Sequence, residues 1–241
     1  MEPQIAFAAC RGTYHIQSDL PCQDSAGGRK WGDFAAVVLA DGAGSCPYAQ
    51  QGAMAAVETT LKLLEEKGAD WICGETGPIP CAVISACLES FAQNPYEPQE
   101  QACTLLFCLI HADGRYLCGH LGDGYLFRIS GETACVLSAP ENGEALNETV
   151  FVTSPKAEEH FRLTRGVLQR GEAILLCSDG AGEALYARDD GHCAPALLRM
   201  GAWMGSHSQE EISRALSYNL DSVFREKSLD DMSIALVSCR S

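Results

Sequence analysis

The helical and strand patterns of this chain come in groups rather than in strict alternation. Apolar residues spaced three or four apart predict helices over residues 48–67, stopping at Gly68, and over 81–93, 192–203 and 209–224. Short apolar runs predict strands over 34–40, 102–111, 115–121, 125–129, 133–137, 173–177 and 232–238. Grouped strands with paired helices favour antiparallel sheets covered by helices over a doubly wound parallel sheet. We therefore expect an α/β sandwich.

The middle of the chain carries the densest strand pattern. Its four predicted strands, over residues 102–137, are separated by turn signals such as Gly122-Asp123-Gly124 and are interpreted as a meander. Residues 138–171 are polar and too long for an ordinary connection, so we expect a functional loop or flap there. The sequence has no repeat or linker, which predicts a single domain over 1–241.

Composition excludes several classes of protein. With 32 acidic and 17 basic residues, the net charge of −15 disfavours binding to nucleic acid or to an anionic membrane. Neither a signal peptide nor the roughly 18 to 20 apolar residues of a membrane span is present, so we expect a soluble, cytoplasmic protein. The 13 cysteines lie singly in apolar runs without a CxxC pair, which predicts reduced core residues rather than disulfides or a zinc site.

Aspartates stand at the ends of three predicted strands. VVLADG gives Asp41, ILLCSDG gives Asp179, and Asp230-Asp231 precedes MSIALVS. Each Asp-Gly taken alone most often marks only a turn. If the three strand ends meet, however, their carboxylates repel one another strongly, and such a cluster persists only when cations neutralise it. Oxygen ligands select hard ions such as Mg²⁺ or Mn²⁺.

A cluster of this kind predicts hydrolysis of a phosphate ester. Two ions about 3.5 to 4 Å apart would bridge a water, lower its pKa and direct it at phosphorus. Such ions would also give a chain of charge −15 the local positive pole that a phosphomonoester dianion requires. Gly42, which has no side chain, would let its carbonyl oxygen approach a metal closely.

Four blocks of sequence resemble one known family. VVLADGAGS, ACTLLFCLI with GHLGDGYLFRI, ILLCSDGAGEAL and LDDMSIALV are similar, in order, to the motifs of the type 2C metal-dependent protein phosphatases, in a divergent bacterial-type branch. The resemblance covers nearly the whole chain. It implies an α+β fold, a four-layer α/β/β/α sandwich of two antiparallel sheets flanked by helix pairs. It also implies one catalytic domain over 1–241.

The resemblance implies a role for each acidic motif. Asp41 would bridge two Mn²⁺ or Mg²⁺ ions, and the Gly42 carbonyl would bind one of them. Asp179 and Asp230 would hold the other ion. In PCQDS, Asp24 is similar to a carboxylate that supports the water shell of the metals. The remaining implied ligand is Asp123 in LGDG, for a weaker third ion, while Asp231 occupies the usual asparagine position.

Three positions depart from the pattern of the family. Gln23 replaces the usual glutamate, Asp19 stands where an arginine is usual, and Gly124-Tyr125 replaces Ser-Arg. The motifs therefore do not identify the residue that binds phosphate. Arg11 and His15 are the candidates, since either side chain can donate to phosphate oxygens. His15 is also a candidate general acid, with a structural or surface histidine as the alternative.

These observations predict a serine/threonine protein phosphatase. Its partner would be a phosphoserine or phosphothreonine protein substrate, opposing a serine/threonine kinase, and the protein would act as a monomer. The replaced residues leave an alternative, a catalytically silent relative that binds phosphoproteins or signalling partners. A third hypothesis is a metal enzyme acting on small phosphate metabolites.

Overall fold

Two five-stranded antiparallel sheets form the centre of the molecule. The computed structural model describes residues 2–140, 149–189 and 191–240. The first sheet has the strand order β2 (Ser25–Trp31), β3 (Phe34–Ala40), β4 (Leu105–His111), β5 (Arg115–Leu121) and β8 (Arg162–Val167). The second has the order β1 (Glu2–Cys10), β12 (Met232–Arg240), β9 (Glu172–Cys177), β6 (Tyr125–Ser130) and β7 (Thr133–Ser138).

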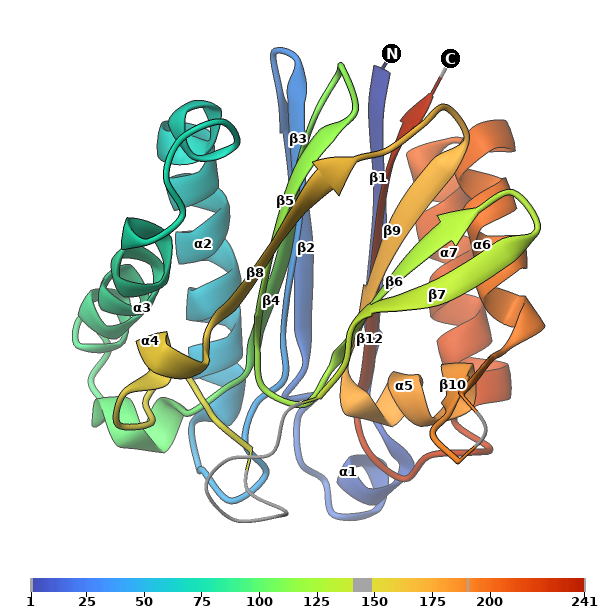
Figure 1. Cartoon of the computed structure of the whole chain (residues 1–241). Helices are drawn as coiled ribbons and strands as arrows, with labels where there is room; N and C mark the ends of the chain where they lie inside the picture. The colour runs from blue at the N-terminus through green and yellow to red at the C-terminus, as the bar shows by residue number, and fades with distance from the viewer. Residues whose placement is uncertain (1, 141–148, 190, 241) are drawn as a thin grey trace.

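Helix pairs cover the outer faces of both sheets (Figure 1). The first sheet packs against α2 (Ala49–Trp71) and α3 (Pro78–Phe91), and the second against α6 (Pro195–Ser206) and α7 (Gln209–Asn219), which continues as a π-helical turn, Leu220–Phe224. A third apolar cluster fills the space between the sheets. The expected four-layer α/β/β/α sandwich is confirmed. The shorter elements are α1 (Thr13–Gln17), a 3₁₀ turn (Pro98–Gln101), α4 (Ala157–His160), α5 (Asp179–Leu185), and the hairpin of β10 (Tyr186–Ala187) and β11 (His192–Cys193).

Strand β3 illustrates why the strands read as continuous apolar runs. Its alternate residues Ala36 and Val38 pack toward α2 and α3, whereas Val37 and Leu39 pack between the sheets. Both faces of β3 are therefore buried. A strand buried on both faces favours an apolar residue at every position rather than at every second one. The strand carries this buried scaffold directly to Asp41.

The predicted meander is wrong. β4 and β5 pair in the first sheet, but β6 and β7 pair in the second, so the chain changes sheets at Gly122-Asp123-Gly124. Gly122 has φ of +110°, a conformation that side-chain-bearing residues rarely adopt, and a Cβ there would lie 2.5 Å from the Thr104 side chain. Gly122-Asp123-Gly124 does form a turn, as predicted, but this turn connects the two sheets instead of two paired strands of one sheet.

The predicted loop over residues 138–171 is wrong in part. It contains α4 and strand β8, which pairs with β5 at the edge of the first sheet. β8 is half-exposed and polar, so its sequence lacks a clear strand pattern. The part around Asn142-Gly143 lies outside the described residues.

Helix α2 runs past its predicted stop. It continues to Trp71, and Gly68 lies inside it against Leu109 of β4, whose Cδ2 would be 2.8 Å from an added Cβ. This glycine therefore allows close packing between the helix and the sheet, rather than ending the helix. The other predicted helices and strands are present, most of them with shifted ends.

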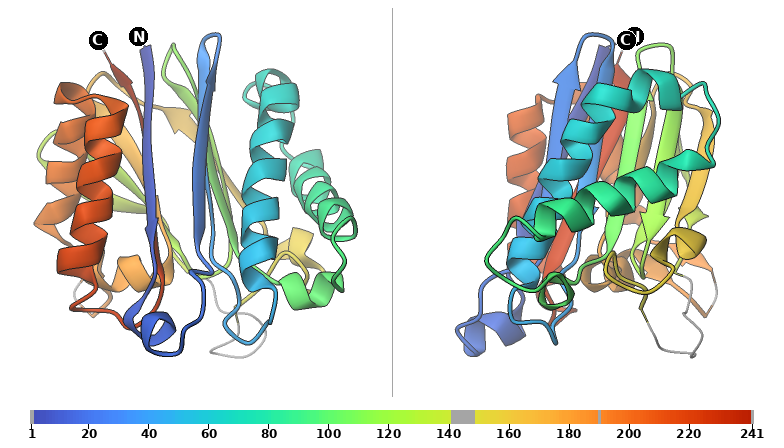
Figure 2. Two further views of the ribbon diagram at one scale, coloured as in Figure 1. Left: turned by 180° about the vertical axis from the view of Figure 1, so that it is seen from behind. Right: turned by 90° about the vertical axis from the view of Figure 1, so that its left-hand side faces the viewer.

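The cysteines are only partly core residues. All thirteen are free thiols, but six are buried, four are half-buried and three are exposed. Among the described residues, we find no helix with the length and apolar character of a membrane span. Both termini lie at one end of the sandwich, and α1 and α5 lie at the other (Figures 1 and 2).

Candidate metal centre

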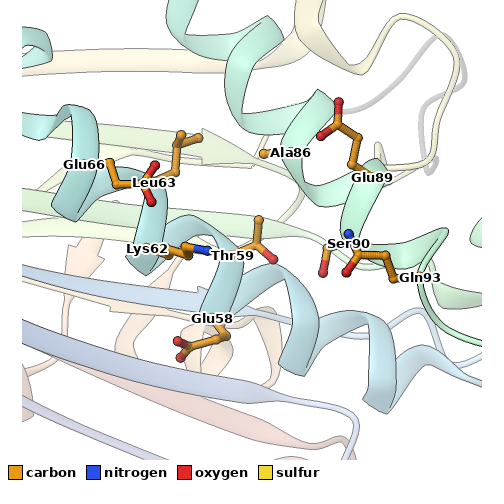
Figure 3. A pocket seen from close by; sticks show the side chains of 9 residues that line it. All are labelled: Glu58, Thr59, Lys62, Leu63, Glu66, Ala86, Glu89, Ser90 and Gln93. Atoms are coloured by element: carbon orange, nitrogen blue, oxygen red, sulfur yellow. The ribbon is translucent and has the colours of Figure 1, made fainter.

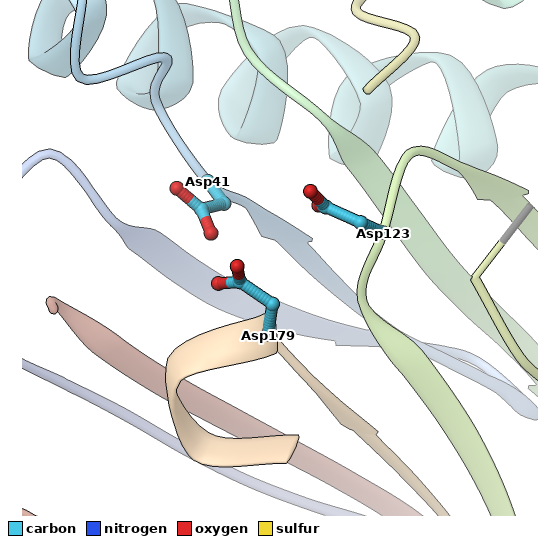
Figure 4. A group of neighbouring side chains, drawn as sticks. All are labelled: Asp41, Asp123 and Asp179. Carbon is cyan, nitrogen blue, oxygen red and sulfur yellow. The ribbon is translucent and has the colours of Figure 1, made fainter. Parts of the chain in front are cut away.

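Three aspartates meet at the end of the sandwich opposite the termini (Figure 4). Asp41 follows β3, Asp123 lies where the chain changes sheets, and Asp179 begins α5 directly after β9. Carboxylate oxygens of the three residues all lie within 4.8 Å of one another. Both sheets thus contribute to one acidic cluster, which the structure assembles from residues 138 positions apart in the sequence (179 − 41).

The backbone around Asp41 is fixed by pairing with Thr104. The Asp41 amide donates to the Thr104 hydroxyl oxygen at 3.0 Å, and the Asp41 carbonyl accepts from the Thr104 amide at 2.8 Å. At Gly42 an added Cβ would lie 2.9 Å from the backbone oxygens of Ala49 and Gln23. Only glycine fits this close approach, so the Asp-Gly pair has a packing reason in addition to its turn.

The other two carboxylates have neutral donors. The Gly180 amide donates to Asp179 Oδ1 at 2.6 Å, and the Thr149 hydroxyl donates to Asp123 Oδ2. Among the described residues, no lysine, arginine or histidine forms an ion pair with any of the three clustered aspartates. Their negative charges are therefore not compensated by basic side chains.

Burial and the neighbouring negative charges raise the pKa values of Asp41 and Asp179. Burial raises the pKa of Asp41 well above its usual range, and the neighbouring Asp24 and Asp179 carboxylates raise it further. Burial, followed by repulsion from Asp123, raises the pKa of Asp179 to about 6. A donor set made only of oxygens, crowded and short of positive charge, fits hard divalent cations such as Mg²⁺ or Mn²⁺.

Asp24 lies buried beside the cluster with one oxygen unused. Its Oδ2 accepts from the Ser233 hydroxyl at 2.6 Å, while Oδ1 is buried without a hydrogen-bond partner among the described residues. Burial raises the pKa of Asp24 to about 7, against the opposing effect of the Ser233 hydroxyl. An orphaned carboxylate oxygen at this place fits a water or ion that completes the site.

Asp230 is not part of the acidic cluster. It is exposed, and its Oδ1 accepts from the Asp231 amide at 2.8 Å. Its charge contributes to the raised pKa of Asp179, which places it in the neighbourhood of that residue. The structure thus brings Asp41, Asp123 and Asp179 together, and leaves Asp230 outside this group of oxygens.

Asp231 has a role that the sequence did not reveal. It is buried, with Oδ1 accepting from the Gly12 amide at 2.6 Å, and Oδ2 accepting from the Gln23 amide at 2.5 Å and lying 2.7 Å from His15 Nδ1. These three partners lie more than 200 positions away in the sequence, so no local signal could identify them. Asp231 therefore anchors the segment that carries the N-terminal candidates.

The two phosphate-binding candidates lie on this anchored segment. His15, on α1, is buried and held by Asp231. The Arg11 guanidinium donates from Nη1 to the Leu20 carbonyl at 3.1 Å, which ties the two ends of the α1 region together. Asp19, at the position where arginine was expected, is exposed and has φ of +53° in the turn after α1.

Comparison with known proteins gives consistent matches. The sequence model of the protein phosphatase 2C family matches residues 11–221. Serine/threonine-protein phosphatase 3 of Escherichia coli (strain K12) is 26% identical over 250 residues, with 98% of each chain covered.

Solved structures of phosphatases share the fold. The serine/threonine phosphatase PstP/Ppp of Mycobacterium tuberculosis gives a TM-score of 0.64 at 14% identity, covering 100% of both chains. A bacterial serine phosphatase gives 0.68 at 13% identity, covering 97% of this chain and 96% of its own. RsbX in complex with magnesium gives 0.59 at 15% identity, covering 98% and 94%.

Proposed function

Because this chain belongs to the protein phosphatase 2C family and is a phosphoprotein phosphatase, we propose that it hydrolyses phosphoserine and phosphothreonine in proteins with two Mn²⁺ or Mg²⁺ ions. The observation that carries this proposal is the gathering of Asp41, Asp123 and Asp179 within 4.8 Å without a basic partner among the described residues. Metal dependence is a property of the family. The identity of the ions and their number are our proposal.

Each acidic residue has a proposed position in the site. Asp41 would contact both ions, the Gly42 carbonyl one of them, and Asp179 with Asp230 the other. Asp230 is exposed and outside the acidic cluster, so its proposed role requires its side chain to turn toward Asp179. Asp123 would help to hold a weaker third ion.

When bound, such ions would supply a water of lowered pKa for attack on phosphorus, and positive charge for the phosphate oxygens. The protein contributes the alignment. Thr104 and the close packing at Gly42 fix the backbone of Asp41, and Asp24 offers its unpartnered Oδ1 to an ordered water. The raised pKa of Asp24 allows that oxygen to hold a proton near neutral pH.

The N-terminal segment would serve the substrate. We propose that His15 and Arg11 contact the phosphate, and that His15 protonates the leaving oxygen. Asp231 holds His15 through Nδ1, so Nε2 is the nitrogen left for substrate. For Arg11, this role requires its guanidinium to leave the Leu20 carbonyl.

The silent-binding alternative is not favoured, because the family, the curated relative and the acidic cluster all agree with catalysis. Phosphoproteins are the substrates that the family implies. We further propose that the protein is a cytoplasmic monomer opposing a serine/threonine kinase. Sedimentation of the purified protein tests the monomer, and comparison of phosphopeptides with sugar phosphates tests the class of substrate.

The test is hydrolysis of an aryl phosphate and of a phosphothreonine peptide with Mn²⁺, Mg²⁺ or chelator. We expect chelator, Asp41→Ala and Asp179→Ala to abolish both activities while thermal unfolding stays cooperative. Asp70→Ala, which removes an exposed carboxylate on α2, is the matched control and should keep full activity. Equal turnover in the wild type and in the two cluster variants would remove the proposed roles.

A further inference from the structure

Exposed apolar side chains are concentrated on two segments of the described chain. Eight large apolar side chains of the described residues are exposed, and six of them lie on two segments. One segment is α1 with its following turn, and the other runs from the end of α7 to β12. The six are Tyr14, Ile16 and Leu20 on the first segment, and Tyr218, Val223 and Leu229 on the second.

These two segments are in direct contact. The Tyr14 amide donates to the Leu229 carbonyl at 2.9 Å, and both side chains are more than half exposed, at 59% and 70%. In Figures 1 and 2, α1 and the connection into β12 lie side by side at the end of the sandwich that holds the acidic cluster. An exposed apolar patch of this kind marks an interaction surface more often than isolated apolar residues do.

A basic pocket continues this surface. A cavity of about 240 Å³ lies between α5, the start of α6 and the π-helical turn, and Val223 is part of its lining. Apart from alanine, proline, valine and phenylalanine, the pocket is lined by Arg199 and Lys227. Neither cation has an ion-pair partner among the described residues. Nearby Glu183 and Glu226 do not line it.

The chain has 32 acidic and 17 basic residues, yet this pocket is lined by two basic side chains and by no carboxylate of the described residues. The groove between α2 and α3, on the other flank, shows the contrast (Figure 3). It is larger, about 410 Å³, but it is lined by Glu58, Glu66 and Glu89 with one lysine. An acidic segment would be repelled from that groove and attracted to the basic pocket.

The basic pocket is within reach of the candidate metal centre. Helix α5 begins at Asp179, and Ala184, five residues later, lines the pocket. At 1.5 Å per residue this separation is about 8 Å, which an extended peptide covers in about three residues. A residue about three positions from a phosphorylated side chain at the aspartates would therefore reach the side of the pocket that Ala184 lines.

We propose that Tyr14, Leu229, Val223, Lys227 and Arg199 form a docking strip for the flank of the phosphoprotein substrate, and that the strip selects a flank with acidic and leucine-like side chains. The carboxylates would pair with the two cations, and the apolar side chains would cover Val223, Leu229 and Tyr14. This proposal rests on the proposed function, since it takes a phosphoprotein as the substrate. Charge complementarity distinguishes this occupant from a second copy of the chain, whose net charge of −15 would repel its own kind.

The experiment compares two phosphothreonine peptides at about 0.15 M salt, where the repulsion from distant charges is largely screened. One peptide has aspartate and leucine two to four residues from the phosphothreonine on both sides, and the other has serine and glycine there. Hydrolysis of an aryl phosphate serves as the reference for each variant. We expect the wild type to favour the acidic peptide in kcat/KM, and Arg199→Glu with Lys227→Glu to lower this preference about fivefold or more.

Lys67→Glu is the matched control, because it reverses an exposed charge on α2, on the other flank. It should leave the preference unchanged. An equal preference in the wild type and in the Arg199→Glu, Lys227→Glu variant, with the aryl phosphate hydrolysed by both, would overturn the docking strip alone. Failure of the wild type to hydrolyse the aryl phosphate with Mn²⁺ would instead count against the proposed function.

Binding can be measured without catalysis. Fluorescence anisotropy of a labelled, unphosphorylated acidic-leucine peptide should give tighter binding to the wild type than to the double variant, and loss of affinity in Val223→Ser. Equal affinities would contradict the proposal whether or not the protein is active. A dimer in sedimentation that Leu229→Ser and Val223→Ser dissociate, with peptide preference unchanged, would assign the surface to a second copy and overturn the proposal.

Discussion

The Asp231 carboxylate and the acidic cluster lie at the same end of the molecule but are stabilised in opposite ways. Asp231 accepts two backbone amides and pairs with His15, all at 2.7 Å or less. Asp41, Asp123 and Asp179 lie within 4.8 Å of one another, and the described residues offer them only neutral donors. The hydrogen bonds formed on folding therefore satisfy the Asp231 carboxylate. The three clustered carboxylates need added positive charge to relieve their repulsion.

The difference teaches how to separate a structural aspartate from a candidate ligand. A buried carboxylate whose oxygens are all used by donors cannot give them to a metal without losing those bonds. Crowded carboxylates with raised pKa, such as Asp179, gain from any dication that binds them. Replacing Asp231 should therefore lower the stability of the fold, whereas replacing a clustered aspartate should lower the activity.

The largest expected effect is loss of activity in the acidic cluster. Asp41→Asn should lower kcat for an aryl phosphate by at least about 100-fold, because a neutral amide weakens the hold on both ions. In chelator the same variant should be as stable as the wild type or more stable, since one of the repelling charges is gone. Turnover measurements check the loss of kcat, and chemical unfolding of the same preparation in chelator checks the stability. A clear loss of stability without metal would contradict the comparison.

The second effect is on folding. Asp231→Ala should lower the free energy of unfolding by about 3 kcal/mol, because the amides of Gly12 and Gln23 lose their acceptor. For a chain of this size that corresponds to a Tm about 6 to 12 °C lower. Calorimetry with chelator measures it. Asp231→Asn, which keeps one acceptor oxygen, should cost less, and equal stability of all three proteins would show that the anchor is dispensable.

The third prediction concerns pH without metal. The pKa of Asp179 is raised to about 6 and that of Asp24 to about 7, above the unfolded value of about 3.9. Their ionisation therefore opposes folding: these groups cost nothing below about pH 4, and the stability they remove grows as pH rises through 6 and 7. Tm from pH 4 to 8 in chelator should fall more for the wild type than for Asp179→Asn, and saturating Mn²⁺ should reduce the difference. Parallel curves would argue against the raised pKa.

The smallest effect should come from Asp123. Asp123→Asn keeps an oxygen that can accept from the Thr149 hydroxyl and removes only the charge proposed to hold a weaker third ion. We expect kcat to fall less than about tenfold, which is under about 1.4 kcal/mol of transition-state stabilisation. Steady-state rates over a range of Mn²⁺ concentrations check this. A loss as large as that of Asp41→Asn would place Asp123 among the main ligands.

The sequence predicted the strands that bring Asp41 and Asp179 to the site. Residues 34–40 form a strand with those same bounds, and the strand predicted over 173–177 begins one residue earlier, because strands buried on both faces are recognisable as apolar runs. The positions of the Asp-Gly pairs at strand ends were also predicted. Whether the strand ends meet depends on how the two sheets pack together. The strand patterns alone could not predict this, and the expectation came from the family resemblance.

Strand β2 could not be predicted from its composition. In SAGGRKW the two glycines are low in strand propensity, yet they sit where the layers approach closely. An added Cβ at Gly27 would lie 2.9 Å from Val57 of α2, and one at Gly28 would lie 2.9 Å from Ile5 of β1. The anchor at Asp231 was missed for a related reason, since its partners become neighbours only after both sheets have formed.

The central claim is that the acidic cluster is a site for divalent cations. Anomalous diffraction from crystals grown with Mn²⁺ tests it most directly. We predict two peaks at the cluster, with oxygens of Asp41 and Asp179 at about 2.1 Å from an ion. Well-ordered side chains at Asp41, Asp123 and Asp179 with no anomalous peak between them, at millimolar Mn²⁺ and neutral pH, would contradict it.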